Sequence, residues 1–280
     1  MKAILFLITI NFLFVARAEE KTWEYPEDIP EAIAPTLELA GSRPAGVLRY
    51  LLSQGARGAE LSPDGKTLAF IWAISGVPQL WTISTEGGFP TQLTFGESIT
   101  FFKWTPSGKD LLISKDDAGN ERESFSLLSA DGTREDVLLE LSNAFRRFGD
   151  FSADGSRFVY ASTERNGTDF DVMLYNIETR QSETLHTGTF GFFPVSWQPN
   201  GNKIIVTETR GEDGNNVYLL EITTGQLKEL FVPKISANFS DFAWKRDGSG
   251  FFLATNLDRE FNALACLLYT SPSPRDFTES

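Results

Sequence analysis

The chain has very little sulfur and almost no imidazole. Cys266 is the single cysteine and His186 the single histidine among 280 residues, and methionine occurs only twice. One cysteine cannot form a disulfide within the chain, and one cysteine with one histidine cannot supply the three or four ligands of the usual zinc site. We therefore expect no internal disulfide, no structural zinc and no bound cofactor.

Basic residues are scarce as well. Lys and Arg number 25 against 38 Asp and Glu, so the net charge is -13. Such a surface repels a polyanion, which excludes a nucleic-acid partner. Aromatic residues are plentiful, with 24 Phe, 6 Trp and 6 Tyr, and these large flat side chains favour strands. The composition therefore indicates an acidic protein that is rich in strands.

Residues 1–18 have the pattern of a secretory signal peptide. Lys2 is followed by a largely apolar run from Ala3 to Val15 and then by Ala16-Arg17-Ala18. This run is shorter than the roughly 20 residues that a membrane helix needs. We predict cleavage after Ala18, a mature net charge of -15 once Lys2 and Arg17 are lost, and export to the periplasm or the extracellular space. No later segment is long and apolar enough to span a membrane.

A tetrapeptide turn signal recurs along the chain. Its five copies are Ser62-Pro63-Asp64-Gly65, Thr105-Pro106-Ser107-Gly108, Ser152-Ala153-Asp154-Gly155, Gln198-Pro199-Asn200-Gly201 and Lys245-Arg246-Asp247-Gly248. Successive glycines are 43, 47, 46 and 47 residues apart, which is the length of one four-stranded propeller blade. Because proline presets φ and Asp-Gly or Asn-Gly tolerates a positive φ, each copy is predicted to join two antiparallel strands.

The rest of each repeat has room for four strands and for no helix of 10–12 residues. The residue before each turn is predicted to be core; these residues are Leu61, Trp104, Phe151, Trp197 and Trp244. The second strands are predicted at 68–72, 111–113, 158–160, 204–206 and 251–253, the third at 79–83, 125–128, 172–175 and 217–220, and short fourth strands around Leu93, 137–138, Leu185 and Leu230. The predicted fold is therefore an all-β propeller of four-stranded antiparallel blades, incomplete at about four and a half blades.

The two flanks of this region differ from it. Residues 19–56 contain four prolines and are predicted to form an irregular arm, with at most a short helix near Val47 to Leu52, before a partial propeller at 57–265. The string CLLYTSPSPRD, from Cys266 to Asp276, resembles a translated sequencing-library adapter. We therefore predict that residues 266–280 are adapter read-through and that the natural chain is longer than this truncated one.

Three strings carry a family resemblance: LSPDGKTLAF at 61–70, PQLWTISTEGG at 78–88 followed by Gln92-Leu93-Thr94, and DDAGNERESFSLL at 116–128. They resemble the N-terminal β-propeller of the prolyl oligopeptidase family of serine peptidases, in its dipeptidyl-peptidase and acylaminoacyl-peptidase branches, over about Arg57 to Ala265. The resemblance implies a propeller that screens peptides by size before an α/β-hydrolase domain that follows it. A peptide substrate would then be a partner only through that missing domain.

No catalytic residue is expected in this chain. An α/β-hydrolase places its serine in a G-x-S-x-G elbow, and that pentapeptide does not occur. His186 lies at the end of a predicted fourth strand, where a structural or solvated role is expected. No cofactor-binding or metal-binding residue is assigned, and the substrate-binding residues are unknown.

For several other patterns we prefer a structural or solvated role over a functional site. The oxygen-rich loops at Asp116-Asp117 with Asn120-Glu121 and at Glu212-Asp213 with Asn215-Asn216 are predicted to be solvated turns rather than Ca²⁺ sites. Arg146-Arg147 is predicted to be an exposed basic loop. Glycosylation patterns occur at Asn166-Gly167-Thr168 and Asn238-Phe239-Ser240. A phenylalanine group is predicted to be core between blades; it comprises Phe95, Phe101, Phe102, Phe145, Phe148, Phe190, Phe192 and Phe193.

Two further functions stay open on sequence grounds. One is a periplasmic propeller of Tol-like type that serves as a protein-interaction scaffold without a catalytic domain. The other is a propeller enzyme, such as a lyase or glycosidase that uses carboxylates of the central tunnel. In either case an incomplete ring is expected to self-associate through the apolar faces of its terminal blades.

Overall fold

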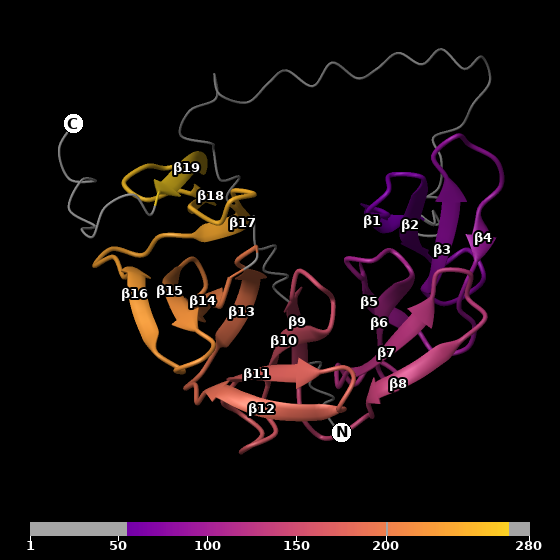
Figure 1. The fold of residues 1–280 in the computed structure, drawn as a ribbon, viewed down its shortest axis with the longest axis horizontal. Coiled ribbons are helices and arrows are strands. Elements are labelled where there is room, and N and C mark those ends of the chain that lie inside the picture. The colour runs from indigo at the N-terminus through magenta and orange to yellow at the C-terminus, as the bar shows by residue number, and fades with distance from the viewer. Residues whose placement is uncertain (1–54, 200, 269–280) are drawn as a thin grey trace, which may run out of the picture. The chain divides into compact units, whose positions relative to one another are not determined.

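The fold is described from a computed structural model for residues 55–199 and 201–268. These residues form five antiparallel sheets arranged as a β-propeller, which confirms the predicted fold class (Figure 1). Each sheet is one blade whose strands are hydrogen-bonded in chain order. The predicted signal peptide, nearly all of the predicted arm, Asn200 and residues 269–280 lie outside the described residues.

The bounds of the strands follow the repeat closely. Blade 1 contains β1 (Arg57–Leu61), β2 (Thr67–Trp72), β3 (Gln79–Ser84) and β4 (Thr91–Gln92), and blade 2 contains β5 (Ile99–Trp104), β6 (Asp110–Lys115), β7 (Ser124–Ser129) and β8 (Glu135–Leu139). Blade 3 contains β9 (Arg146–Phe151), β10 (Arg157–Ser162), β11 (Asp171–Asn176) and β12 (Gln181–His186). Blade 4 contains β13 (Phe192–Trp197), β14 (Lys203–Thr209), β15 (Asn215–Glu221) and β16 (Leu227–Phe231).

Blade 5 has one strand more than the sequence predicts. It contains β17 (Phe239–Trp244), β18 (Gly250–Thr255) and β19 (Ala263–Leu268). In β19, Cys266 pairs with Phe252 and Leu268 pairs with Gly250. The first three residues of the adapter-like string therefore continue the strand pattern of the repeat.

The repeated turn is held by a small network of side chains. In the third copy Ser152 Oγ donates to Asp154 Oδ1 at 2.6 Å, and the backbone N–H of Arg157 donates to Ser152 Oγ at 3.0 Å. Ser62 and Asp64 make the same hydrogen bond at 2.7 Å. The turn between β7 and β8 uses it again, from Ser129 to Asp131 at 2.6 Å. These hydrogen bonds favour the charged carboxylate and lower the pKa of Asp131 and Asp154 to about 2.

Neighbouring turns also pack on each other. A Cβ atom on Gly108 would lie 3.2 Å from Pro63 of the preceding turn, and one on Gly155 would lie 3.2 Å from Pro106. Both glycines have φ near +70°, which L side chains rarely adopt. Glycine is therefore required at this position for two reasons: the turn needs a positive φ, and the preceding turn leaves little space for a side chain.

We expect replacement of Asp154 by asparagine to reduce the dependence of stability on acid pH. The folded pKa of Asp154 lies below its ordinary value, so its ionised form stabilises the fold above about pH 4 and this contribution is lost as the pH falls toward 2. The thermal midpoint of the wild type should fall more steeply than that of Asp154→Asn between pH 5 and pH 2. Ser152→Ala, which removes the hydroxyl donor, should also flatten the curve. Parallel curves for all three proteins would contradict this origin.

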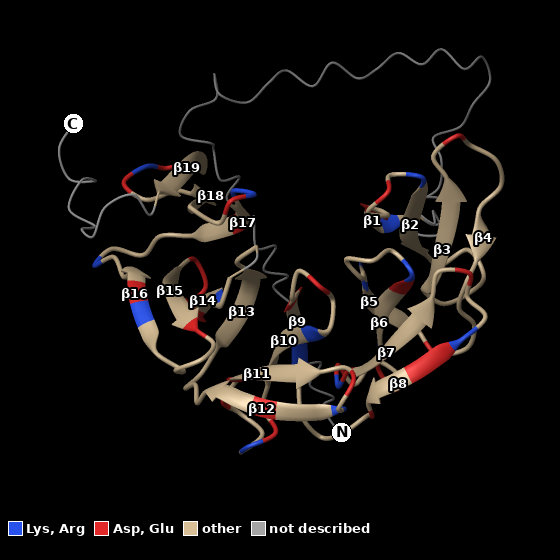
Figure 2. Cartoon of the chain, in the orientation of Figure 1, with Lys and Arg blue, Asp and Glu red and all other residues tan. Residues whose placement is uncertain are grey.

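The hydrophobic core consists of four clusters, each between two consecutive blades. Side chains of β2 and β3 meet those of β5 and β6, and the same arrangement follows between blades 2 and 3, 3 and 4, and 4 and 5. Polar contacts reinforce it: Tyr175 donates to Leu138 O at 3.0 Å, and Arg180 forms an ion pair with Asp136 at 2.7 Å on the acidic strand β8 (Figure 2). Each blade is therefore stabilised mainly by its neighbours.

The predicted core column before the turns is only partly correct. Trp104, Phe151 and Trp197 are buried, Trp244 is half-buried, and Leu61 is exposed. The buried members pack against the preceding blade, as Trp104 does when its Nε1–H donates to Glu60 O at 3.3 Å. Leu61 belongs to the first described blade, so no preceding blade covers it within residues 55–199 and 201–268.

Candidate functional site

One end of the propeller is built from two kinds of loop. In an antiparallel meander, the loop from second to third strand and the connection to the next blade leave the sheet at the same end. We call this end the loop face. Its described segments are 73–78, 93–98, 116–123, 140–145, 163–170, 187–191, 210–214, 232–238 and 256–262.

Polar side chains at the start of the third strands hold the loop face together. In blade 1, Gln79 accepts from Thr94 Oγ1 at 2.7 Å and donates to Gly96 O at 3.0 Å. In blade 3, Asp171 accepts from Arg165 Nε at 2.8 Å and from the backbone N–H of Gly188 at 2.9 Å. Both are buried, so each fixes a connection between blades through satisfied hydrogen bonds.

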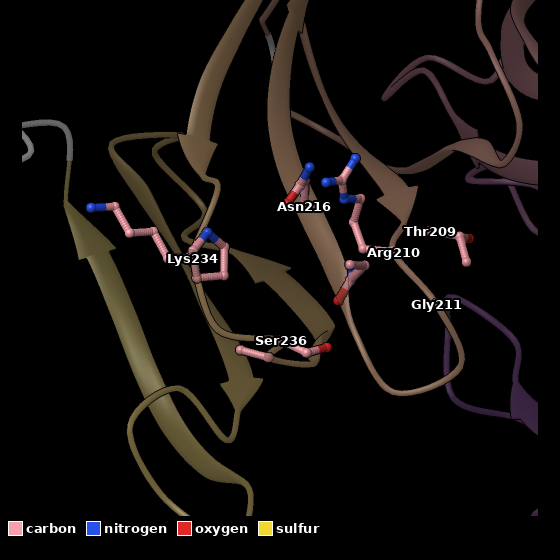
Figure 3. A pocket seen from close by; sticks show the side chains of 9 residues that line it. Thr209, Arg210, Gly211, Asn216, Lys234 and Ser236 are labelled. Carbon is pink, nitrogen blue, oxygen red and sulfur yellow. The ribbon is translucent and has the colours of Figure 1, made fainter.

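A pocket of about 460 Å³ lies on the loop face where the β14–β15 loop meets the connection to blade 5 (Figure 3). Its lining residues are Thr209, Arg210, Gly211, Asn215, Asn216, Pro233, Lys234, Ser236 and Ala237. Asn215 is fully engaged with the Phe239 backbone, donating at 3.0 Å and accepting at 2.8 Å. Ser236 Oγ donates to Asp213 at 2.9 Å. The wall is therefore fixed by hydrogen bonds before any ligand binds.

The two cations of this pocket retain donor capacity. Arg210 is mostly exposed and lies 3.9 Å from Glu208, whose other oxygen accepts from Tyr218 at 2.7 Å. Lys234 is exposed, and within the part of the chain that the structure describes it makes no ion pair. Guanidinium and ammonium groups bind carboxylates and phosphates by charge-assisted hydrogen bonds. Both residues line the pocket, but Figure 3 shows the amino end of Lys234 directed away from Arg210. Arg210 is therefore the cation that is placed to hold the anionic end of a small molecule.

Sequence reasoning missed Arg210 and Lys234. They are 24 positions apart, in loops that the repeat pattern treats as ordinary, and only the packing of blade 5 on blade 4 brings them to one pocket. The available signal was Arg210, a basic residue just before the Glu212-Asp213 loop in an acidic chain; the sequence offered none for Lys234. Asp213 is a partner of the pocket wall rather than a free turn residue.

The Asp116-Asp117 loop is a tight turn, but it is not wholly solvated. Asp116 is buried, contrary to the prediction, because its Oδ2 accepts from the backbone N–H of Glu121 at 3.2 Å inside the loop. Asn120 Oδ1 accepts from the N–H of Arg122 at 2.9 Å. Within residues 55–199 and 201–268, no group of three or more His, Cys, Asp or Glu residues is placed to hold a metal ion.

The Arg146-Arg147 pair is not an exposed loop, and this prediction is wrong for Arg146. Both residues lie in β9, where Arg146 is buried and its guanidinium donates to the carbonyl oxygens of Glu123 and Glu140. Arg147 is exposed, and its guanidinium carbon lies 4.9 Å from the centroid of the Phe193 ring. Adjacent residues of a strand point to opposite sides, so the side chain of Arg146 is buried beneath the loop face while that of Arg147 is exposed.

Glu123 is a partly buried carboxylate on the same side of the propeller. Its Oε1 accepts from Thr100 Oγ1 at 2.8 Å, and Arg147 lies close enough to stabilise its charge. Burial is the largest effect and raises the pKa of Glu123 above its ordinary value, against the opposing hydrogen bond from Thr100. The sequence offered no signal for Glu123 beyond its place in the DDAGNERES segment.

A row of charged side chains follows the first strands. Lys103 of β5 forms an ion pair with Glu60 of β1 at 2.7 Å. Asp150 of β9 accepts from the backbone N–H of Trp197 in β13 at 2.9 Å and from that of Phe151 at 2.8 Å. Burial raises the pKa of Asp150 although these hydrogen bonds favour its charged form. These contacts join the first strands of blades 1 and 2 and those of blades 3 and 4.

His186 ends β12, as the sequence predicts, and its ring lies 5.2 Å from the Phe192 ring. Burial lowers the pKa of His186, which favours the neutral imidazole, although Asp171 opposes this shift. The structure therefore places His186 in an aromatic contact between blades 3 and 4.

The remaining sequence signals have mixed outcomes. Phe102 and Phe192 are buried as predicted, whereas Phe95 and Phe190 are exposed because they lie in connections that precede the first strands. The other four members of the phenylalanine group are half-buried; these are Phe101, Phe145, Phe148 and Phe193. Asn166 is exposed and its side chain accepts from the N–H groups of Thr168 and Asp169, which makes it a turn residue. Asn238 is half-buried, and its N–H donates to Asn256 at 2.7 Å.

No family model matches this chain, and no curated protein matches it. Solved structures do match. An oligogalacturonate lyase in complex with manganese aligns at a TM-score of 0.59 and 15% identity, over 76% of this chain and 58% of the lyase. A putative TolB from Agrobacterium tumefaciens aligns at 0.55 and 17% identity, over 72% and 70%. One of two prolyl endopeptidases aligns at 0.56 and 17% identity, over 72% and 32%.

The fold is shared with all three. Their identities are too low to transfer an activity, and the three structures carry different names. The chain spans little more than half of the lyase and about a third of the prolyl endopeptidase. Function must therefore be argued from the residues of this chain.

Among residues 55–199 and 201–268, no helix has the length and apolar character to cross a membrane.

Proposed function

We propose that this chain is the propeller of an exported serine peptidase of prolyl oligopeptidase type, and that it controls the access of short peptides to an α/β-hydrolase domain outside this chain. By itself the chain is inactive, since the catalytic serine, aspartate and histidine belong to that other domain. The pocket at Arg210 and Lys234 is where the propeller binds a carboxylate of the peptide.

The observation that carries the proposal is that the strings resembling this family occupy a propeller which aligns with about a third of a prolyl endopeptidase. The string at 61–70 covers the first turn and the first four residues of β2, and the string at 78–88 covers β3. The string at 116–128 contains the loop that places Asp116 and Glu123 on the loop face. The cationic pocket on that face adds a chemical reason to expect an anionic peptide terminus.

Binding of a tripeptide and of its C-terminal amide tests the pocket directly. We expect Ala-Ala-Phe to bind more tightly than its amide in calorimetry, because only the acid offers a carboxylate to Arg210. Arg210→Gln should weaken binding of the acid by about 10- to 100-fold, since a hydrogen bond to a charged group contributes about 1.5–3 kcal/mol, and should leave binding of the amide unchanged.

Lys228→Gln is the matched control. It removes the same charge from an exposed lysine of β16 that does not line this pocket, so binding of the acid should stay within about twofold of the wild type. Two results would contradict binding of a carboxylate in this pocket. They are equal affinity for the acid and the amide, and an equal loss of affinity for the acid in Arg210→Gln and Lys228→Gln.

A scaffold function is the second candidate, and the alignment with a TolB propeller over 70% of that chain favours it. The two candidates differ in what the gene encodes after Ala265. A continuing frame with further blades, a G-x-S-x-G elbow and later Asp and His would support the peptidase, and its product should react with a fluorophosphonate probe. A stop codon after a few more strands would leave the scaffold.

A further inference from the structure

A fixed carboxylate lies next to the cation of the pocket. Glu208 lies in β14, and the register of the hairpin places it opposite Asn216 of β15. Its Oε2 accepts from the Tyr218 hydroxyl at 2.7 Å and from Asn216 Nδ2 at 2.8 Å. Only 14% of the Glu208 side chain is exposed, and Asn216 is buried. Two donors of β15 therefore hold the carboxylate of Glu208 in one position.

Tyr218 is suited to its role as a donor. Burial raises the pKa of Tyr218, and the hydrogen bond to Glu208 raises it as well, so the hydroxyl keeps its proton. The Tyr218 ring lies 5.8 Å from the Phe192 ring of β13, and Asn216 Nδ2 donates to the hydroxyl oxygen at 3.2 Å. The fold therefore sets the position of the hydroxyl, and with it that of the Glu208 carboxylate.

Arg210 lies close to this carboxylate without a hydrogen bond to it. Its Nη1 is 3.9 Å from Glu208 Oε1, a distance at which the charges attract but no hydrogen bond forms. Within residues 55–199 and 201–268 the guanidinium makes no hydrogen bond, and 62% of the Arg210 side chain is exposed. Figure 3 shows Arg210 beside Asn216 at the pocket. Glu208 therefore attracts the guanidinium and leaves its donors free for a ligand.

We propose that Glu208 is a positioning residue, which holds the Arg210 guanidinium ready for a carboxylate of the ligand. This role rests on the proposed binding of a peptide carboxylate at Arg210. An arginine side chain that moves freely loses rotamer freedom when it binds, whereas a side chain that is oriented beforehand loses less. Glu208 thereby increases the affinity for an anion although its own charge is negative.

The sign of the effect separates positioning from simple electrostatic repulsion. A carboxylate near an anion site repels the ligand, so its removal should tighten binding if it has no other role. Removal of a positioning carboxylate should weaken binding instead. Glu212 is the matched control for repulsion, because it is exposed and lies in the same loop as Arg210.

Calorimetry with Ala-Ala-Phe and its C-terminal amide tests the proposal. Glu208→Gln keeps the shape of the side chain and removes its charge, so binding of the acid should weaken about three- to fivefold while binding of the amide stays unchanged. Glu212→Gln should bind the acid as tightly as the wild type or more tightly.

A second variant tests the hydrogen bond that holds Glu208. Tyr218→Phe leaves every charge in place and removes one of the two donors to Glu208, so binding of the acid should weaken about twofold. The double variant Glu208→Gln/Tyr218→Phe should bind the acid no more weakly than Glu208→Gln, because Tyr218 acts through Glu208.

NMR relaxation measures the positioning without a ligand. The order parameter of the Arg210 Nε–H bond should fall in Glu208→Gln and in Tyr218→Phe, and it should keep its wild-type value in Glu212→Gln. A role in stability alone would lower the thermal midpoint and leave this order parameter unchanged in the folded protein.

Two results would overturn the positioning role. They are binding of the acid that is unchanged or tighter in Glu208→Gln, and an Arg210 order parameter that does not fall in this variant. Failure of the proposed function is distinguishable, because the wild type would then bind the acid and the amide equally, and the order parameter would still decide the role of Glu208. If Glu208→Gln unfolds, Tyr218→Phe decides by the same two measurements, since it retains the charge.

Discussion

Replacement of Phe158 by alanine is expected to lower the free energy of unfolding by about 3–5 kcal/mol, the range for a buried phenylalanine truncated to alanine. Phe158 is fully buried in β10. Its ring lies 4.9 Å from that of Tyr175, nearly parallel, and 6.1 Å from that of Phe125 in blade 2. Three more rings surround it within the same cluster: Phe148, Phe151 and Tyr160.

The large effect has two causes. The substitution removes apolar surface from the core, and it leaves a cavity between two sheets that cannot collapse without separating blades 2 and 3. Urea unfolding followed by tryptophan fluorescence measures the loss. Phe89→Ala is the matched control, because Phe89 is almost fully exposed and its removal should change stability by less than about 0.5 kcal/mol. Similar losses for the two variants would show that Phe158 is not in a closed core.

The substitution Gly149→Ala is expected to have the next largest effect, a loss of about 1–3 kcal/mol or more from overpacking. A Cβ atom at Gly149 would lie 2.6 Å from Pro194 O, and 3.0 Å from both Pro194 Cγ and Val159 O. Its φ is outside the left-handed region, so the cost is steric and not conformational. Since two of these atoms are backbone oxygens, β9 and β13 would have to move apart.

That movement should also break the hydrogen bond from the Trp197 N–H to Asp150, which joins blades 3 and 4 next to Gly149. Hydrogen exchange at the Trp197 amide is therefore expected to speed up in Gly149→Ala in addition to the lower midpoint in urea. Gly55→Ala is the matched control, because a Cβ at Gly55 meets nothing within 4 Å. Unchanged exchange at Trp197 would contradict a close approach of β9 and β13.

The strand order and the turns could be predicted because their causes are local. A Ser or Thr, a Pro, an Asp and a Gly within four residues set the backbone of the hairpin whatever surrounds it, and Ser152 with Asp154 shows the network directly. Alternation of apolar residues after each turn then predicts a strand with one or two buried faces. The predicted second and third strands all fall within the observed ones.

Apart from the third strand of blade 5, the errors concern burial. Leu61 was predicted to be core from its column, and it is exposed because burial there comes from the preceding blade. Arg146 was predicted to be exposed from its charge, and it is buried because the loop face offers carbonyl oxygens for its guanidinium. Phe95 and Phe190 were predicted to be core from their type, although they lie beyond the strands.

The candidate site depends more than the strands and turns do on contacts between residues that are far apart in the sequence. Arg210 and Lys234 enter one pocket because Asn215 binds the Phe239 backbone and so fixes the connection to blade 5 against the β14–β15 loop. No periodicity relates the two positions. Glu123 and Asp150 owe their raised pKa mainly to burial by neighbouring elements.

The sequence by itself determined the repeat, the turns, the strand order within each blade and the acidic charge, because these follow from residue types at short spacing. The tertiary structure decided which columns are buried and which cations line one pocket. The physical reason is that a blade buries its two faces only against other blades. Leu61 and Trp104 hold one position of the repeat, and within residues 55–199 and 201–268 only Trp104 has a preceding blade that buries it.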